Sequence, residues 1–177
     1  MRTAFCFSLF CLVAATTTHA EAQGQHIQGL RPEVHAGVGF HGFLSAGFDL
    51  EFAIVPDGFL RRMDDELALA VGFDLLFGDF GRDRDRDDPR GLGFAPNVTA
   101  QWNFYLSEKW SVFPEVGVTV LFLTEGDHRY YRGHGRGGRR GYVDAVAGIG
   151  ARLHFGRRMA LVFRVGFPFG GQIGLNF

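Results

Sequence analysis

The feature that most constrains this chain is an alternation of side-chain character with a period of two. From residue 33 to the last residue, bulky apolar residues repeatedly occupy every second position, and small or polar residues stand between them. Successive side chains of a β-strand point to opposite faces, so this period predicts strands, and a helical period fits these segments less well. The segments reach the roughly 9–11 residues that a tilted strand needs to cross a bilayer.

We expect eight strands. They cover residues 33–41, 43–55, 66–77, 94–106, 110–124, 141–155, 159–167 and 171–177. In the second of these, Leu44 and Phe48 fall on one face, whereas Ser45 and Asp49 fall on the other. The fifth is less regular, because Leu121 shares a face with polar residues.

The composition indicates which face meets water. A face exposed to water needs charged side chains at most positions, but here the polar face is crowded with small residues, in a chain with 26 Gly and 20 Phe. Among the basic residues Lys109 is the single lysine, although soluble surfaces carry many. Small residues suit a narrow interior, and lipid tolerates no open sheet edge. We therefore expect an all-β fold, an eight-stranded antiparallel up-and-down transmembrane β-barrel. A soluble periplasmic lipocalin-like carrier is the alternative.

The first 22 residues have the form of a cleaved export signal. Arg2 precedes an apolar stretch, Ala4–Ala15, and Ala20-Glu21-Ala22 has the small-x-small form of a cleavage site. The apolar stretch is shorter than the roughly 20 residues of a membrane helix. Both cysteines lie in this segment, so the mature chain has none. We expect a signal peptide over 1–22, a short periplasmic segment over 23–32 and a barrel over 33–177.

Connection lengths and strand ends are typical of such a barrel. The two longest charged connections, 78–93 and 125–140, both follow odd-numbered strands, whereas 107–109 and 156–158 are short. Outer-membrane barrels have short periplasmic turns and longer outer loops. Aromatic residues near the strand ends suggest a girdle at each membrane interface. At one rim these include Trp102, Trp110 and Phe155; near the other they include Phe94, Tyr142 and Phe169.

The last strand, Gln172-Ile173-Gly174-Leu175-Asn176-Phe177, alternates and ends on phenylalanine. It resembles the C-terminal assembly signal of bacterial outer-membrane barrels, with Leu175 where an aromatic residue is common and Phe177 at the end. In length and strand number the whole mature chain resembles small barrels of the OmpA/OmpX type. The resemblance implies the outer membrane of a Gram-negative bacterium, contact with lipid and with the barrel-assembly machinery, and a monomer.

The polar face carries charges that we expect to meet inside the barrel. Buried charges must pair, so we predict an ion-pair network that fills the lumen. An eight-stranded barrel is just wide enough for side chains, which argues against a diffusion pore; a proton or ion path is the alternative. We expect no metal and no cofactor. The network residues are Asp49, Glu51, Asp74, Glu115, Asp144, Arg152 and Arg164, with His35 and His154 on the same face.

Two charged connections are candidates for binding. Arginine forks bind phosphate and carboxylate well, and lipopolysaccharide supplies such groups at the outer surface. One connection is therefore a candidate anion-binding loop, and a mobile loop without a ligand is the alternative; its arginines are Arg129, Arg132, Arg136, Arg139 and Arg140. Export argues against nucleic acid as its partner. The other connection alternates in sign over 81–88, which indicates a self-neutralising loop. A weaker alternative is a divalent cation site of Asp83, Asp85, Asp87 and Asp88.

An enzyme is the remaining alternative. Lipid A deacylase and palmitoyltransferase barrels resemble this chain in general architecture, and such activities need a serine near a histidine. His41 and Ser45 share the polar face with Asp49, but a spacing of four does not make a triad. The leading expectation is a non-enzymatic outer-membrane barrel that is structural or presents charged loops to anionic surface partners.

Overall fold

A computed structural model of the chain describes residues 29–40, 42–60, 62–78, 91–123, 141–155 and 159–177, and these form an all-β structure. The strands are β1 (Leu30–Val38), β2 (Leu44–Val55), β3 (Asp65–Gly78), β4 (Gly91–Tyr105), β5 (Trp110–Leu123), β6 (Gly141–Phe155), β7 (Met159–Phe167) and β8 (Gly170–Asn176). In this described part, no helix has the length and apolar character needed to cross a membrane.

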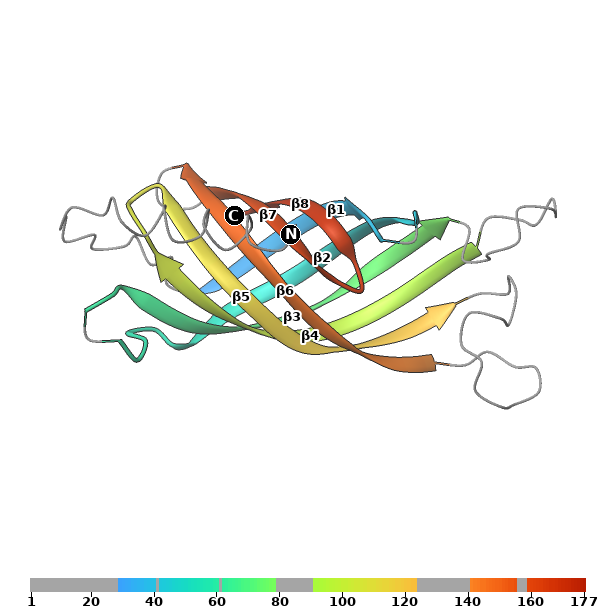
Figure 1. The fold of residues 1–177 in the computed structure, drawn as a ribbon, viewed down its shortest axis with the longest axis horizontal. Helices are drawn as coiled ribbons and strands as arrows, with labels where there is room; N and C mark the ends of the chain where they lie inside the picture. Colours follow the sequence, from blue (N-terminus) through green and yellow to red (C-terminus); the bar gives the residue numbers. More distant parts are fainter. Residues whose placement is uncertain (1–28, 41, 61, 79–90, 124–140, 156–158) are drawn as a thin grey trace, which may run out of the picture.

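The eight strands close into one antiparallel barrel in which each strand pairs with its neighbours in sequence (Figure 1). The ring is completed by pairing of β1 with β8, in register from Glu33 opposite Asn176 to Val38 opposite Gly171. Phe177 lies just beyond β8, and its N–H donates to the carbonyl of Pro32 at 2.9 Å. The predicted strand number, antiparallel order and closure are therefore confirmed.

The strand bounds agree closely with the alternation, with one useful difference. β1 begins at Leu30 rather than at residue 33, so Arg31 belongs to the barrel wall and its side chain is buried. In the sequence, the alternation of Glu33 and His35 continues back to Arg31. Pro32 sits near the start of β1, where a missing N–H is tolerated.

The two ends of the barrel differ, and we name them by their connections. At the turn end lie the β2–β3, β4–β5 and β6–β7 connections, on the left in Figure 1. At the loop end lie the strand ends that flank residues 79–90 and 124–140, together with the tight β1–β2 and β7–β8 turns. The candidate anion-binding arginines and the acidic run of 83–88 fall outside the described residues.

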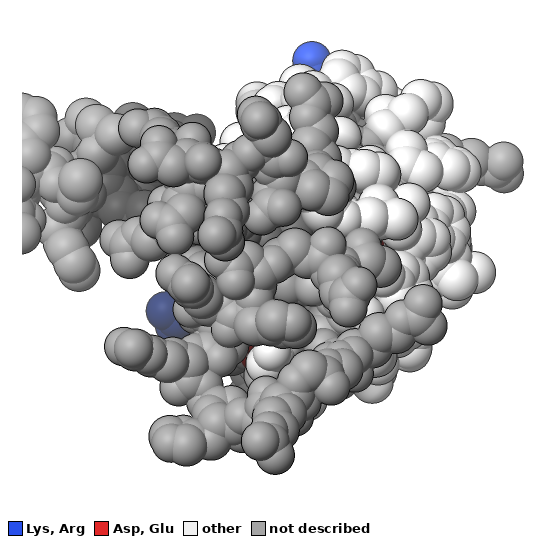
Figure 2. Space-filling view, turned by 90° about the vertical axis from the view of Figure 1, so that its right-hand side faces the viewer, with Lys and Arg blue, Asp and Glu red and all other residues white. Residues whose placement is uncertain are grey.

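The wall presents opposite chemistry to its two sides. Its outer face carries large apolar side chains on every strand, such as Val116 and Val143, which are 62% and 75% exposed. Figure 2 looks onto the loop end, and the uncovered flank of the wall is almost continuously formed by uncharged residues. Polar and charged side chains point inward and are buried, among them Glu33, Asp74 and Arg152. The predicted division of the two faces is thus present in the fold.

Candidate functional site: a filled polar interior

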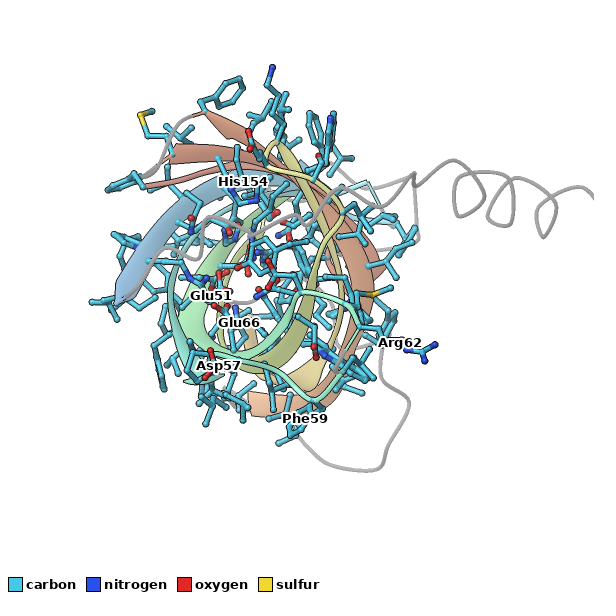
Figure 3. All side chains as sticks on the ribbon, turned by 90° about the vertical axis from the view of Figure 1, so that its left-hand side faces the viewer. Glu51, Asp57, Phe59, Arg62, Glu66 and His154 are labelled. Carbon is cyan, nitrogen blue, oxygen red and sulfur yellow. The ribbon has the colours of Figure 1, made fainter. Side chains whose placement is uncertain are left out.

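Two clusters of charged side chains occupy the interior from the turn end to the middle of the barrel. We call them the turn-end cluster and the middle cluster. Figure 3 looks in from the turn end, where Glu51, Glu66 and His154 lie inside the ring of strands. Every carboxylate of the two clusters is at most 5% exposed, so the clusters fill the interior and leave little of it to water.

The turn-end cluster is built on two arginines from different strands. Arg31 of β1 donates through Nη2 to Oε1 of Glu51 at 2.9 Å and also to Oε1 of Glu66. Arg152 of β6 donates to Oε2 of Glu51 at 2.7 Å, and its guanidinium carbon lies 4.3 Å from the centre of the Phe113 ring. Two charges of each sign meet here, so the turn-end cluster is balanced.

Neutral amides complete the turn-end cluster. Asn103 donates to Oε1 of both Glu51 and Glu66, at 3.1 Å each, and accepts from Nη1 of Arg152 at 2.7 Å. Gln101 accepts from Nη2 of Arg152 at 2.7 Å. These amides form hydrogen bonds with the carboxylate oxygens and guanidinium N–H groups that the ion pairs do not satisfy. Buried charges are tolerated when their remaining hydrogen-bonding groups are satisfied in this way. The polar residues of β4 are therefore structural partners of the charges.

The middle cluster is built on a single arginine. Arg164 of β7 donates through Nη2 to Oε1 of Glu33 at 2.7 Å and through Nη1 to Oδ2 of Asp49 at 3.1 Å. Its Nε lies 3.8 Å from Oε2 of Glu115. Gln101 donates to the same oxygen of Glu115 at 3.3 Å and so joins the two clusters.

His35 and Asp74 form the other half of the middle cluster. Nε2 of His35 lies 3.0 Å from Oδ1 of Asp74. Asp74 also accepts from Asn97 at 3.2 Å and from Gln172 at 3.0 Å. Gly47 faces this histidine, and a Cβ there would collide with the imidazole ring. The absence of a side chain at Gly47 thus leaves the space that the His35 ring occupies.

The structure brings six of the seven predicted network residues into these clusters, namely Asp49, Glu51, Asp74, Glu115, Arg152 and Arg164. The seventh, Asp144, lies toward the loop end of β6, half-buried, and accepts a hydrogen bond from the N–H of Ala145 at 2.8 Å. Sequence reasoning did not include Arg31, Glu33 and Glu66 in the network. Glu66 was the first residue of an expected strand, and its partners come from strands distant in sequence.

An apolar plug fills the loop end of the interior. It consists of Phe43, Leu76, Ala95, Leu121, Val146 and Phe169, with Leu123 and Tyr142 packed against it. The plug explains why Leu121 breaks the alternation of its strand, since it points inward among apolar neighbours. It also corrects the expected aromatic girdle, because Phe169 and Tyr142 belong to the interior rather than to the outer surface.

The serine and histidine expected for an enzyme are not shown as a pair. Ser45 is buried and its hydroxyl has no hydrogen bond to any described residue, while His41 lies outside the described residues. A different pair is present: Oγ of Ser111 lies 2.9 Å from Nε2 of His154, on neighbouring strands. Ser111 is 0% exposed, so a substrate carbonyl has no approach to its hydroxyl. Only the register of β5 with β6 brings these residues together.

The fold and its interior define a small closed antiparallel β-barrel with a filled polar lumen and an apolar exterior. A comparison with protein-family models finds no match to this chain, and a comparison with curated proteins finds none either.

Proposed function

We propose that this chain is an outer-membrane β-barrel of the small OmpA/OmpX-like type, exported by the signal over 1–22. The observation that carries the proposal is the orientation of the wall: exposed apolar side chains outside, charged clusters inside. A soluble carrier of the lipocalin kind needs the reverse arrangement, with an apolar cavity. Closure of the sheet leaves no unpaired edge, as hydrocarbon requires.

The proposed role is structural rather than conductive or enzymatic. A lumen filled by hydrogen-bonded charged and amide side chains and closed at one end by an apolar plug favours a rigid membrane component over a diffusion pore. The buried position of Ser111 argues against a hydrolase that uses it. On this proposal the wall holds the charged connections of residues 79–90 and 124–140 at one membrane surface.

A pair of arginine substitutions on the outer face tests the membrane assignment. Val116 lies midway along β5, whereas Leu106 follows the end of β4 at the turn end. Arginine on a lipid face costs about 2–4 kcal/mol at the bilayer middle and about 0–1 kcal/mol near the interface. We therefore expect Val116→Arg to lower unfolding stability in phospholipid vesicles and Leu106→Arg to leave it nearly unchanged.

The same proteins are then examined by cell fractionation and by gel mobility before and after boiling. A folded outer-membrane barrel is extracted by detergent and changes its mobility on boiling. Release of wild-type protein by salt or lysis alone, together with equal tolerance of both arginines, would contradict the proposal.

Within this proposal, the arginines of 124–140 bind phosphate or carboxylate groups of lipopolysaccharide. Replacement of Arg129, Arg132, Arg136, Arg139 and Arg140 by Gln is expected to abolish salt-sensitive binding to lipopolysaccharide micelles, because surface charge interactions are screened by salt. The matched control replaces Arg82, Arg84 and Arg86, which alternate with aspartates. Equal loss of binding in the two variants would show that the attraction is not specific to the arginine-rich segment.

A further inference from the structure

The negative charge of the interior is concentrated in the middle cluster. The turn-end cluster pairs two carboxylates with two guanidinium groups. In the middle cluster Arg164 is the one guanidinium, and with a neutral His35 the cluster has an excess of three negative charges. Its four carboxylates are those of Glu33, Asp49, Asp74 and Glu115. Uncompensated charge in a dry interior is strongly unfavourable, so a further cationic species is expected there.

The two ring nitrogens of His35 indicate where that cation belongs. Nε2 faces a carboxylate of Asp74, which only accepts hydrogen bonds, so Nε2 carries the proton. When the ring is neutral, Nδ1 therefore has no proton and carries a lone pair. It lies 3.7 Å from Oε1 of Glu33 and 3.7 Å from Oδ2 of Asp49, and it makes no hydrogen bond to any described residue.

Nδ1 of His35 thus lies beside two carboxylate oxygens without a hydrogen bond to either of them. The ligand atoms of His35, Glu33 and Asp49 all lie within 4.8 Å of one another, and the His35 side chain is 1% exposed. A separation of 3.7 Å is too long for a hydrogen bond. It does suit two ligands that each lie about 2.0–2.2 Å from one shared ion. Oδ1 of Asp49 is also buried without a hydrogen-bond partner among the described residues.

The surroundings of His35 match those of a metal-bound imidazole. Such a histidine usually donates its second ring N–H to a carboxylate, which fixes the ring and raises its basicity. Asp74 has this position and is itself held by Asn97 and Gln172. Arg164 contacts the same oxygens of Glu33 and Asp49, but each carboxylate oxygen has two lone pairs and accepts both an N–H and an ion.

We propose that Nδ1 of His35 and the carboxylates of Glu33 and Asp49 bind one divalent transition-metal ion inside the barrel. Imidazole and carboxylate donors suit zinc, manganese and similar ions. One such ion reduces the excess of the middle cluster from three negative charges to one. The site differs from the sequence expectation of no metal, and it does not depend on the proposed membrane location.

The test uses the mature chain refolded in detergent with Zn²⁺ or with a chelator, followed by desalting and elemental analysis. The ligands are buried, so we expect the ion to enter during folding and to remain, at about one ion per folded chain, as for a closed site. Refolding with Co²⁺ is expected to give the visible absorption of a nitrogen- and oxygen-ligated ion.

Matched variants separate this site from other histidines. His35→Gln is expected to lose the ion, whereas His154→Gln retains it, because His154 is also interior but contacts Ser111. The double variant His128→Gln/His134→Gln controls for the connection over 124–140 and is expected to retain the ion. Far-ultraviolet circular dichroism verifies the β-structure of each variant, independently of any change in gel mobility on boiling.

Asp74→Asn keeps the shape of the residue and serves if His35→Gln fails to fold. Loss of an outer-sphere partner typically weakens metal binding by about 10- to 100-fold, and we expect a decrease of this size. The proposal would be overturned if folded wild-type protein retained no Zn²⁺. The negative charge of the middle cluster would then be compensated by bound protons. Retention of the ion in folded His35→Gln, or unchanged affinity in Asp74→Asn, would overturn the proposal equally.

Discussion

The two halves of the barrel interior are filled by different kinds of side chain. From the turn end to the middle, carboxylates, guanidinium groups and amides hold one another by hydrogen bonds. At the loop end the same inner face carries Phe43, Leu76, Leu121 and Phe169, which belong to one buried hydrophobic cluster. One alternating pattern thus supports both a directional polar network and an ordinary hydrophobic core.

The difference matters for how each half tolerates change. Removal of one member of a buried ionic network leaves its partners charged and unpaired, whereas removal of an apolar group leaves a void. In the polar half, loss of a single contact is therefore expected to lower the free energy of unfolding strongly. In the apolar half, the decrease is expected to scale with the volume that is removed. The following predictions are arranged from the largest expected effect to the smallest.

Arg152→Met is expected to have the largest effect. It removes the donor to Glu51, Asn103 and Gln101 while keeping most of the side-chain volume. Breaking one partner of a buried pair costs about 3–5 kcal/mol. Unfolding by guanidinium chloride in detergent measures the loss, and Arg62→Met at the exposed turn-end rim is the control. Equal stability of the two variants would mean that the polar half tolerates loss of a charge as an apolar core does.

Leu76→Ala tests the apolar plug. Leu76 is 1% exposed, and its neighbour Leu75, on the outer face, is 36% exposed. Leucine-to-alanine changes in a core cost about 2–5 kcal/mol, according to how far the cavity collapses. We expect Leu76→Ala to destabilise the barrel clearly more than Leu75→Ala in the same detergent. A larger effect at Leu75 would show that the inner packing of the plug contributes little.

Gly150→Ala tests the close packing of the barrel wall against Phe113. A Cβ at Gly150 would collide with the ring of Phe113, which lies beneath the Arg152 guanidinium. Overpacking of this kind costs about 1–3 kcal/mol. Gly171→Ala is the matched control, since a Cβ there meets nothing within 4 Å. Thermal unfolding followed by gel mobility is expected to separate the two, and a shared midpoint would disprove the close fit.

Asp65→Ala is expected to have the smallest effect, because it acts at the rim. Asp65 accepts hydrogen bonds from the N–H groups of Phe59 and Leu60 and from Nε1 of Trp102 at 2.7 Å, and so fixes the β2–β3 connection whose Asp57, Phe59 and Arg62 appear in Figure 3. Loss of such a turn anchor costs about 1–2 kcal/mol. We expect faster proteolysis within 55–65 and a loss of global stability no larger than this cost; protection of this segment would contradict the assigned role.

Most of the fold follows from local information in the sequence. Alternation gives the strands and their inner face, and closure follows from the need to pair every edge. The site depends on register, which local patterns do not specify. The register of the strands around the ring places Ser111 beside His154. It also places Arg31 beside Glu51 and Glu66. Apolar character alone also misplaced Phe169, which was expected at the outer girdle but belongs to the interior, whereas alternation placed Leu76 on the inner face correctly.

Pairing of the first strand with the last has a consequence for assembly. The ladder between β1 and β8 needs residues from both ends of the chain, and Phe177 still contributes a hydrogen bond to Pro32. Until β8 is available, any partial sheet has two open edges, which are prone to aggregation. The barrel therefore gains its protected form in a late step that joins the most distant parts of the chain. Deletion of β8 is therefore expected to prevent closure of the barrel rather than to leave a smaller one.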